Sequence, residues 1–460
     1  MKQHPLLYFG SVSLILFGAV AMPAHGATQT YQDGNALNTW NTTDLNWDAG
    51  VVWVDGNDAT FAGTGEAVTV GTVTVHNTVF NSTGYNLSGG TITLSGSGPT
   101  ITANQNAIIG SIIAGGNLTK NGTGVLTLSG SNTYSGGTEL TAGTISVGAL
   151  SGIGTGYLAV KFGSTFQYTG SGSETSTATL WLDNGASTFD INNASGSLTW
   201  NAGGGTRNAA FTKTGAGTLT MGGAFSGGAA VTVNGGTLVL STSNSNTGAT
   251  TLTSGTLKAT NTAALGSGNV AMNGGTLQLA TDTAHASRNV TVGGGSSIIL
   301  DRATAGAGFS TSFGSLTFND TYTLSVSKGA NVTSGTATLN FTGFPALGAA
   351  GKTAGFNVGS GVEVHLSGSL TGTQAFAQVA KSGAGTLILS GNNNYWDPAS
   401  NTGLITVSGG TLDLRSQNDG GWHQLGQQHF ARWRVAPRCG WAPTRPRAIT
   451  PRPPSRGTGS

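Results

Sequence analysis

Two short stretches of the sequence have residue spacings associated with phosphate or calcium binding. Residues 346–353 read Ala-Leu-Gly-Ala-Ala-Gly-Lys-Thr, a loose phosphate-loop pattern. Such a loop needs a buried strand before it and a helix after it, whereas residues 356–366 alternate like a strand, so we expect a chance match. Asp55, Asn57 and Asp58 resemble the start of a calcium loop, but no acidic residue stands at the closing position of an EF-hand, which favours an ordinary Asx turn.

The residue types needed for hydrolytic catalysis are present but scattered. His76, His285 and His365 have no neighbours in sequence that suggest a triad, so we expect each to lie alone on a solvated face. Asp183 and Asp190 are the closest acids in the middle of the chain, and paired acids are what polysaccharide hydrolases use. We expect no enzymatic activity, no cofactor and no metal site from these patterns.

The composition narrows the fold class. The 460 residues include 77 glycines and 11 prolines, with 19 Lys and Arg and 17 Asp and Glu. This glycine content argues against a helical bundle, because glycine is unfavourable inside helices. Collagen is excluded because the sequence lacks a strict Gly-X-Y period. A hydrophobic fraction of 37% with little net charge opposes charge-driven disorder. A repetitive all-β protein remains.

Charge is unevenly distributed along the chain. Residues 27–416 hold 11 bases and 16 acids, whereas residues 417–460 hold seven arginines and one acid. The net charge of +2 therefore reflects the tail and gives no reason to expect nucleic acid as a partner. Cys439 is the single cysteine, which excludes an intramolecular disulfide and a cysteine-based metal site.

Residues 1–26 match a secretory signal peptide. Lys2 gives a positive start, residues 6–22 are apolar, and small residues precede the expected cleavage between Gly26 and Ala27. Two glycines within the apolar stretch favour this over an uncleaved membrane anchor. No other segment is apolar for long enough to span a membrane, so we expect an exported chain without a transmembrane segment once mature.

Internal repeats are the most informative feature of the sequence. One unit, a lysine followed by two glycines and an alternating strand, occurs three times. Its signature positions are Lys120, Gly122, Gly124, Leu126 and Leu128; Lys213, Gly215, Gly217 and Leu219; and Lys381, Gly383, Gly385 and Leu387. A second glycine turn and strand follows each copy, at residues 142–145, 235–238 and 409–412. Gly122 and Gly143 are 21 residues apart, as are Gly215 and Gly236, so a period near 20 dominates the middle of the chain.

This period predicts a solenoid. Alternation places leucines on one face of each short strand and threonines on the other, and only stacked copies can bury the apolar face. We predict a right-handed parallel β-helix with about 20 residues per coil, hence on the order of 18 to 20 coils over residues 27–416 at the usual strand spacing. A β-roll of antiparallel hairpins is the alternative, since alternation does not distinguish the two pairings.

Residues 116–147 carry a specific resemblance. The lysine turn, the Asn132-Thr133-Tyr134-Ser135-Gly136-Gly137-Thr138 element and the closing Ala142-Gly143-Thr144-Ile145 strand resemble the autotransporter-associated β-strand repeat, also called the passenger-associated transport repeat of type V secretion. Copies at 213 and 381 match less completely, and residues 27–115, with several tryptophans, resemble a capping region. The resemblance implies a surface or secreted protein exported across the outer membrane, whose repeats aid passage and folding.

The last part of the sequence departs from the repeat pattern. From residue 417 onward, six of the chain's 11 prolines and seven arginines accumulate. Repeated Pro-Arg cannot continue a β ladder, so we expect residues 417–460 to be an unstructured tail, with a frameshift near residue 420 as its origin. On this hypothesis the segment that followed the passenger, a β-barrel or a sorting tail, is missing.

Four regions are therefore predicted: a signal peptide at 1–26, an N-terminal capping β region at 27–115, a repeat-bearing β-helix at 116–416 and a tail at 417–460. The predicted function is that of a non-enzymatic surface passenger in adhesion or cell–cell contact. Its expected partners are a host or neighbouring-cell surface, a polysaccharide, another copy of itself, and the outer-membrane export machinery. The alternative is a carbohydrate-active β-helix enzyme, a lyase or hydrolase, which a cluster of Asp and Arg on adjacent coils would support.

Overall fold

The computed structural model describes residues 26–32, 37–201, 204–343, 352–368, 378–391 and 405–415. The predicted signal peptide up to residue 25, residues 346–351 of the phosphate-loop pattern and the predicted tail lie outside this part of the chain. The chain divides into two compact units. Unit 1 comprises residues 1–257 and 263–268, and unit 2 comprises residues 258–262 and 269–460.

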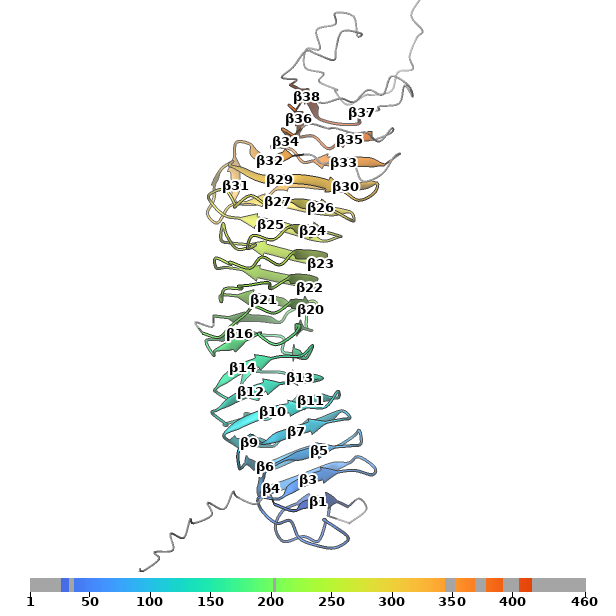
Figure 1. Ribbon diagram of the computed structural model, residues 1–460, viewed down its shortest axis with the longest axis vertical. Coiled ribbons are helices and arrows are strands. Elements are labelled where there is room, and N and C mark those ends of the chain that lie inside the picture. Colours follow the sequence, from blue (N-terminus) through green and yellow to red (C-terminus); the bar gives the residue numbers. More distant parts are fainter. Residues whose placement is uncertain are drawn as a thin grey trace, which may run out of the picture. The chain divides into compact units, whose positions relative to one another are not determined.

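Unit 1 is built from short strands that lie one above another as successive coils (Figure 1). Ladder A consists of β1 (Thr28–Tyr31), β3 (Asp58–Phe61), β5 (Thr78–Phe80), β7 (Thr100–Ala103), β10 (Asn117–Asn121), β12 (Gly137–Leu140), β14 (Tyr157–Val160) and β17 (Leu180–Trp181).

In coils that contain all three ladders, ladder B follows ladder A and ladder C follows ladder B. Ladder B consists of β2 (Thr39–Trp40), the first halves of β4 (Ala67–Val75) and β6 (Asn86–Leu94), β8 (Ala107–Ile109), β11 (Val125–Leu128), β13 (Thr144–Val147), β15 (Thr165–Tyr168), β18 (Ser187–Ile191), β20 (Phe211–Thr214) and the first half of β22 (Val231–Leu240). Ladder C consists of the second halves of β4 and β6, β9 (Ile112–Gly115), β16 (Ser173–Ser176), β19 (Ser197–Trp200), β21 (Thr218–Met221) and the second half of β22. β23 (Thr250–Ala259) and the 3-10 helix η1 (Leu150–Ile153) complete the elements of this unit.

Unit 2 repeats the same construction with longer coils. Its strands are β24 (Val270–Met272), β25 (Thr276–Ala280), β26 (Val290–Val292), β27 (Ser296–Asp301), β28 (Gly306–Ala307), β29 (Ser310–Phe318), β30 (Tyr322–Lys328), β31 (Val332–Ser334), β32 (Ala337–Gly343), β33 (Thr353–Val358), β34 (Val362–Leu366), β35 (Gln378–Ser382), β36 (Thr386–Leu389), β37 (Ile405–Val407) and β38 (Thr411–Leu414). β28 and β31 pair outside the main ladders. No helix in the described part of the chain has the length and apolarity needed to cross a bilayer.

The strand ladders run parallel, which confirms the predicted solenoid over the antiparallel β-roll. The described residues form about 15 turns, so the expectation of 18 to 20 coils was wrong. The reason is that coil length varies. Ala67 pairs with Asn86, 19 residues along, but Tyr322 pairs with Ala354, 32 residues along. The longer coils carry lateral loops that the sequence period does not reveal.

Apolar side chains form columns through the interior of each unit, because residues in register repeat the same chemistry. In unit 1, Leu126, Ile145, Phe166 and Phe189 are successive partners in ladder B and all are fully buried. The alternation in Leu126-Thr127-Leu128 therefore places both leucines in the interior, as predicted. Burial of apolar surface stabilises a fold by about 25 cal/mol per Å². A single coil cannot bury this face alone, so the stabilisation requires stacked coils.

A cluster of aromatic rings fills the first coils of unit 1. Trp40 lies 5.5 Å from Trp47 and 5.3 Å from Trp53, measured between ring centroids, and Phe61 stacks on Phe80 at 5.0 Å. All five side chains are buried. These rings supply a large buried apolar surface in the first coils that the structure describes. The assignment of residues 27–115 as a capping region stays a prediction.

Glycines at the corners let consecutive coils approach closely. A Cβ atom at Gly124 would lie 2.5 Å from the carbonyl oxygen of Gln105 in the coil before, and one at Gly143 would lie 2.5 Å from that of Gly122. Real Cβ atoms do not make such contacts with backbone, so these positions require glycine for space.

We predict that Gly124→Ala destabilises unit 1 by about 1–3 kcal/mol, because the added methyl group forces the coils apart. The matched control is Gly116→Ala in the same coil, where nothing lies within 4 Å of the added Cβ, and its effect stays within about 0.5 kcal/mol. Urea unfolding followed by circular dichroism measures both. Equal effects of the two substitutions would show that close approach at the corner does not limit coil stacking.

Candidate functional site: the lysine turns

The three repeated lysines each begin a corner of the solenoid, which we call a lysine turn. Each lysine is the penultimate residue of a strand, so the turns are Lys120–Gly124 at the end of β10, Lys213–Gly217 at the end of β20 and Lys381–Gly385 at the end of β35. All three lysine side chains point inward and are at most 1% exposed. This is unusual, since lysine is almost never fully buried without a partner.

Each buried ammonium donates three hydrogen bonds to backbone carbonyls, two in its own turn and one in the turn of the next coil. The acceptors are Asn121 (2.8 Å), Gly122 (2.7 Å) and Ala142 (3.1 Å) for Lys120; Thr214 (2.6 Å), Gly215 (3.0 Å) and Gly235 (3.4 Å) for Lys213; and Ser382 (2.7 Å), Gly383 (2.8 Å) and Gly409 (3.0 Å) for Lys381. All three N–H groups of each ammonium are thus used, and each lysine joins two consecutive coils.

Burial rather than a charged partner dominates the electrostatics of these sites. Desolvation lowers the pKa of Lys120, Lys213 and Lys381 from the ordinary value of 10.5 to about 8, and the Asp190 carboxylate partly opposes this shift at Lys213. At neutral pH each lysine is therefore charged inside the solenoid, with carbonyl dipoles in place of a counter-ion.

The glycines of the repeat serve the same corners. Gly122, Gly215 and Gly383 have positive φ angles of 76°, 74° and 74°, which only glycine adopts without strain. A Cβ at Gly124, Gly217 or Gly385 would meet the preceding coil's backbone at less than 3.0 Å. The first glycine thus makes the turn, and the second allows close stacking. Leu126, Leu219 and Leu387 follow in the next strand and are fully buried.

The three lysine turns occupy different corners. Lys120 lies between ladders A and B, because β10 belongs to A and β11 to B. Lys213 lies between ladders B and C, because β20 pairs with β18 and β21 with β19. In unit 2, Lys381 lies between the ladder of β33, β35 and β37 and the ladder of β34, β36 and β38. The motif therefore specifies a corner and not a particular face of the solenoid.

A buried asparagine of the repeat makes a second link between coils, a role that the sequence did not predict. Asn132 Oδ1 accepts from the N–H of Ile113 (2.8 Å), and its Nδ2 donates to the carbonyl of Gly152 (2.6 Å). Asn244 repeats the pattern between the Phe225 N–H and the Ala264 carbonyl. Both asparagines stand in short polar segments of the sequence, at Asn132-Thr133 and in the Ser-Asn-Ser-Asn-Thr stretch at 243–247.

The candidate calcium residues are engaged in structural hydrogen bonds. Asp55 Oδ1 accepts from Trp53 Nε1 (3.1 Å) and from the Thr74 N–H (2.7 Å). Asn57 donates to Gln29 (2.9 Å), and Asp58 accepts from Asn77 and lies 3.1 Å from His76 Nδ1. Within the described residues, no group of three or more His, Cys, Asp or Glu side chains is placed to hold a metal ion. Of the two expected cleavage residues, Gly26 starts the described chain, and the Ala27 carbonyl accepts from the Asp58 N–H (3.1 Å).

The expectation that the histidines lie on solvated faces was wrong for two of the three. His76 and His285 are only 7% and 5% exposed. His285 Nε2 lies 3.0 Å from the Thr281 hydroxyl, and burial together with nearby Arg288 lowers the pKa of His285 to about 4, so it is neutral at pH 7. His365, which is half-buried, lies 2.7 Å from the Ser390 hydroxyl in the next coil. Each of these three histidines contacts a neighbouring coil. His365 also lies within electrostatic range of the Glu363 and Asp413 carboxylates, but burial has the largest effect and lowers the pKa of His365.

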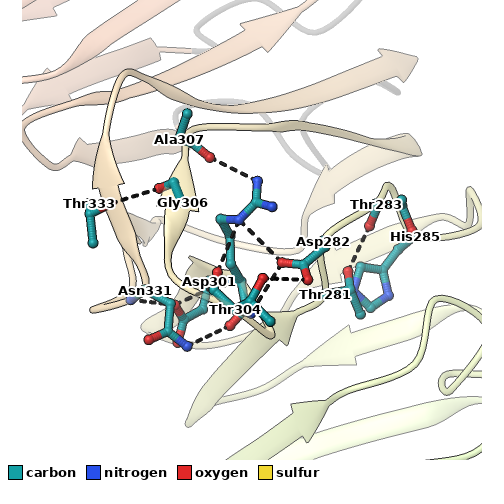
Figure 2. Close-up of polar contacts among 11 residues, drawn as sticks. Thr281, Asp282, Thr283, His285, Asp301, Thr304, Gly306, Ala307, Asn331 and Thr333 are labelled. Atoms are coloured by element: carbon teal, nitrogen blue, oxygen red, sulfur yellow. Dashed lines mark hydrogen bonds and ion pairs between the residues drawn. The ribbon is translucent and has the colours of Figure 1, made fainter.

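Acidic residues gather in one place in unit 2, shown in Figure 2. Asp282 forms an ion pair with Arg302 at 3.2 Å and accepts from the Thr304 hydroxyl at 2.9 Å, across two adjacent coils. Neighbouring Asp301 is 6% exposed, and its carboxylate accepts from the N–H groups of Arg302 and Asn331 and from Gln278. No motif in the sequence points to this cluster, because Asp282 and the segment 301–304 lie on different coils.

This Asp/Arg cluster mainly stabilises the lateral loop that carries β28. The Arg302 guanidinium donates to the carbonyls of Thr304 (3.2 Å) and Ala307 (2.9 Å), which fixes the loop that carries β28. Asp301 is buried and accepts three hydrogen bonds, so Asp282 is the more accessible of the two carboxylates. Asp183 lies in the turn that follows β17, and Asp190 lies on β18, where it accepts from Gln167 (2.8 Å).

The lysine turns have a pH signature whose sign follows from the lowered pKa values. Between pH 8 and 10.5 the unfolded chain binds more protons than the folded chain, so the free energy of unfolding rises with pH through this window. The neutral amine keeps two donors while the desolvation cost disappears. We predict that wild type gains up to about 1.4 kcal/mol per pH unit relative to Lys213→Met between pH 8 and 10.

Urea midpoints at half-unit pH steps measure this difference. Lys328→Met, at an exposed position on β30, serves as the control and keeps the wild-type slope. A Lys213→Met variant with the same slope as wild type contradicts a charged, desolvated lysine in the turn.

Comparison with known proteins agrees with this geometry. The family model described as passenger-associated-transport-repeat matches residues 118–147, 211–240, 234–259 and 379–414. Three of these regions contain a lysine turn, and the region at 234–259 covers coils that follow the second one. Searches of curated proteins and of solved structures found no match. The chain thus carries passenger-associated-transport repeats in four regions, and with its β-solenoid it fits the passenger of an autotransporter.

Proposed function

We propose that this chain is a non-enzymatic, exported surface passenger of an autotransporter-like type V system that works in adhesion or cell–cell contact. Its lysine turns would aid folding during secretion. The signal peptide predicted for residues 1–26, with cleavage between Gly26 and Ala27, is part of this proposal. The repeats come from a family of exported passengers, which suggests an extracellular or surface location.

The observation that carries the secretion role is the self-sufficiency of the lysine turn. Lys213 needs only its own turn and Gly235, 22 residues along, to satisfy its ammonium. A coil that emerges from a membrane pore can therefore dock on its neighbour without any group distant in sequence. Contacts of this local kind let a solenoid grow by nearest-neighbour steps.

The adhesive role is supported by the chemistry of the outer faces. Outward side chains form polar ladders, such as Asn104 donating to Asn81 (2.8 Å) and Asn340 donating to Ser310 (2.9 Å). Charged residues make up only 8% of the chain. An extended, hydroxyl- and amide-rich face of this kind suits hydrogen bonding to a cell surface, a polysaccharide or another copy of the chain. Nucleic acid is not among the proposed partners.

A second candidate function, that of a carbohydrate-active enzyme, rests on the Asp/Arg cluster. It has Asp282 accessible on the surface beside Arg302. Hydrolysis by acid–base catalysis needs two carboxylates that flank the scissile bond, and Asp301 is buried and already accepts three hydrogen bonds. This geometry favours the structural role of the cluster.

We predict that beads coated with the full purified chain aggregate with one another or bind bacterial and epithelial cells, whereas albumin-coated beads do not. In parallel, incubation of the chain with polysaccharides releases no reducing ends or unsaturated uronates. Inert beads contradict the adhesive role. Released sugar ends that disappear in Asp282→Asn favour the enzyme instead.

A further inference from the structure

Ladder C of unit 1 is interrupted for two coils. It runs through β4, β6 and β9, and resumes at β16 and β19. In between, residues 131–135 and the helix η1 take the places of strands, and the Asn132 link joins them. The interruption follows the first lysine turn and precedes the second, which lies one corner further along.

A hollow of about 730 Å³ lies at this interruption. Its lining comes from three consecutive coils: Ser135, Gly136, Leu150, Ser151, Ile153, Gly154, Thr155, Gly156, Tyr157, Thr175, Ser176, Thr177, Ala178 and Thr179. Ser135, Ser151, Thr155, Thr175 and Thr177 are exposed, so the hollow opens to solvent. Its volume falls in the range of small-molecule sites.

The lining is neutral and rich in hydroxyl groups. Eight of the 14 lining residues carry a hydroxyl, and none carries a charge. Among the described residues, the hydroxyls of Ser135, Thr155, Thr175, Thr177 and Thr179 have no protein hydrogen-bond partner, which leaves them available to a ligand. The absence of charge in the lining argues against a phosphate, a sulfate or a cation as the ligand.

One aromatic ring adds an apolar surface to this polar wall. Tyr157 is half-buried, and its ring lies against the backbone of Gly137, where a Cβ would come within 2.5 Å of Tyr157 Cδ1. An aromatic face beside many hydroxyls matches a ligand with both C–H faces and hydroxyls. A sugar ring has this combination.

A peptide strand fits the hollow less well, although β16 begins a ladder and has no strand on its preceding side. Glu174 in β16 accepts from the Leu150 N–H (2.7 Å) and from the Tyr168 hydroxyl (3.1 Å). The start of η1 is thereby tied to β16, which obstructs the addition of another strand. The same contacts occupy the carboxylate of Glu174, which is next to Thr175 of the lining.

We propose that this hollow binds a neutral oligosaccharide. Sugar binding would contribute to adhesion only if the proposed adhesive role holds. The chemical fit of the hollow to a sugar does not depend on that role. The hydroxyls of three coils converge only in the folded solenoid, so the site requires the stacking that the lysine turns and Asn132 maintain.

Isothermal titration of the full chain with maltohexaose, cellohexaose, laminarihexaose and mannohexaose tests the proposal, with hexagalacturonate as the charged comparison. We expect binding of at least one neutral hexasaccharide. The triple variant Thr175→Val, Thr177→Val and Thr179→Val loses at least about tenfold in affinity, since three hydrogen bonds are removed. Ser135→Trp fills the hollow from its exposed rim and abolishes binding. Ser243→Trp, at an exposed position outside the hollow, leaves binding unchanged.

Binding that is absent for all four neutral sugars, unaffected by Ser135→Trp, or stronger for hexagalacturonate overturns the proposal. Circular dichroism establishes that each variant folds. If the triple valine variant does not fold, the effect of Ser135→Trp on binding decides whether the hollow is the binding site. The bead assay separates the two proposals. If coated beads aggregate but the chain binds no sugar, only the sugar-binding proposal is contradicted. If the chain binds sugar but coated beads are inert, only the adhesive role is contradicted.

Discussion

The interaction on which the solenoid depends is the lysine ammonium that donates to three backbone carbonyls across two coils. A corner turns its carbonyl oxygens inward, and a buried acceptor without a donor costs free energy. The ammonium supplies three donors at one point and needs no carboxylate, so the corner is complete within a coil and its neighbour. The surrounding glycines follow from this arrangement, because the ammonium reaches the next coil only where the turns stack closely.

The same module placed at different corners explains why the coils are irregular. The Lys120 turn joins ladders A and B, and the Lys213 turn joins ladders B and C. Between them ladder C stops and restarts, η1 takes the place of a strand, and a solvent-open hollow forms. The repeats thus give the solenoid stable corners, while the less repetitive segments between them are free to vary in length and carry surface features. Under the proposed function, adhesion and stability would depend on different residues.

Much of the fold could be predicted from the sequence, and the failures have physical causes. Alternation around Leu126 and Leu219 predicted buried strand faces, and glycine spacing predicted corners, because both depend on local geometry. Parallel pairing could not be deduced, since alternation is the same in either arrangement. Coil number was overestimated because lateral loops in unit 2 lengthen the coils without disturbing the strand pattern. The buried state of Lys120 was missed because lysine is normally exposed, although its recurrence at three glycine corners was visible. His285 and the Asp301 cluster depend on contacts between coils that no single segment encodes.

Hydrogen exchange followed by mass spectrometry on Lys213→Met tests the central claim most directly. If the ammonium holds two consecutive coils together, amides in residues 211–240 lose protection while those in residues 118–147, held by Lys120, keep it. Unchanged protection at 211–240, or an equal loss throughout unit 1, would contradict the account of the lysine turn as a local clamp between coils.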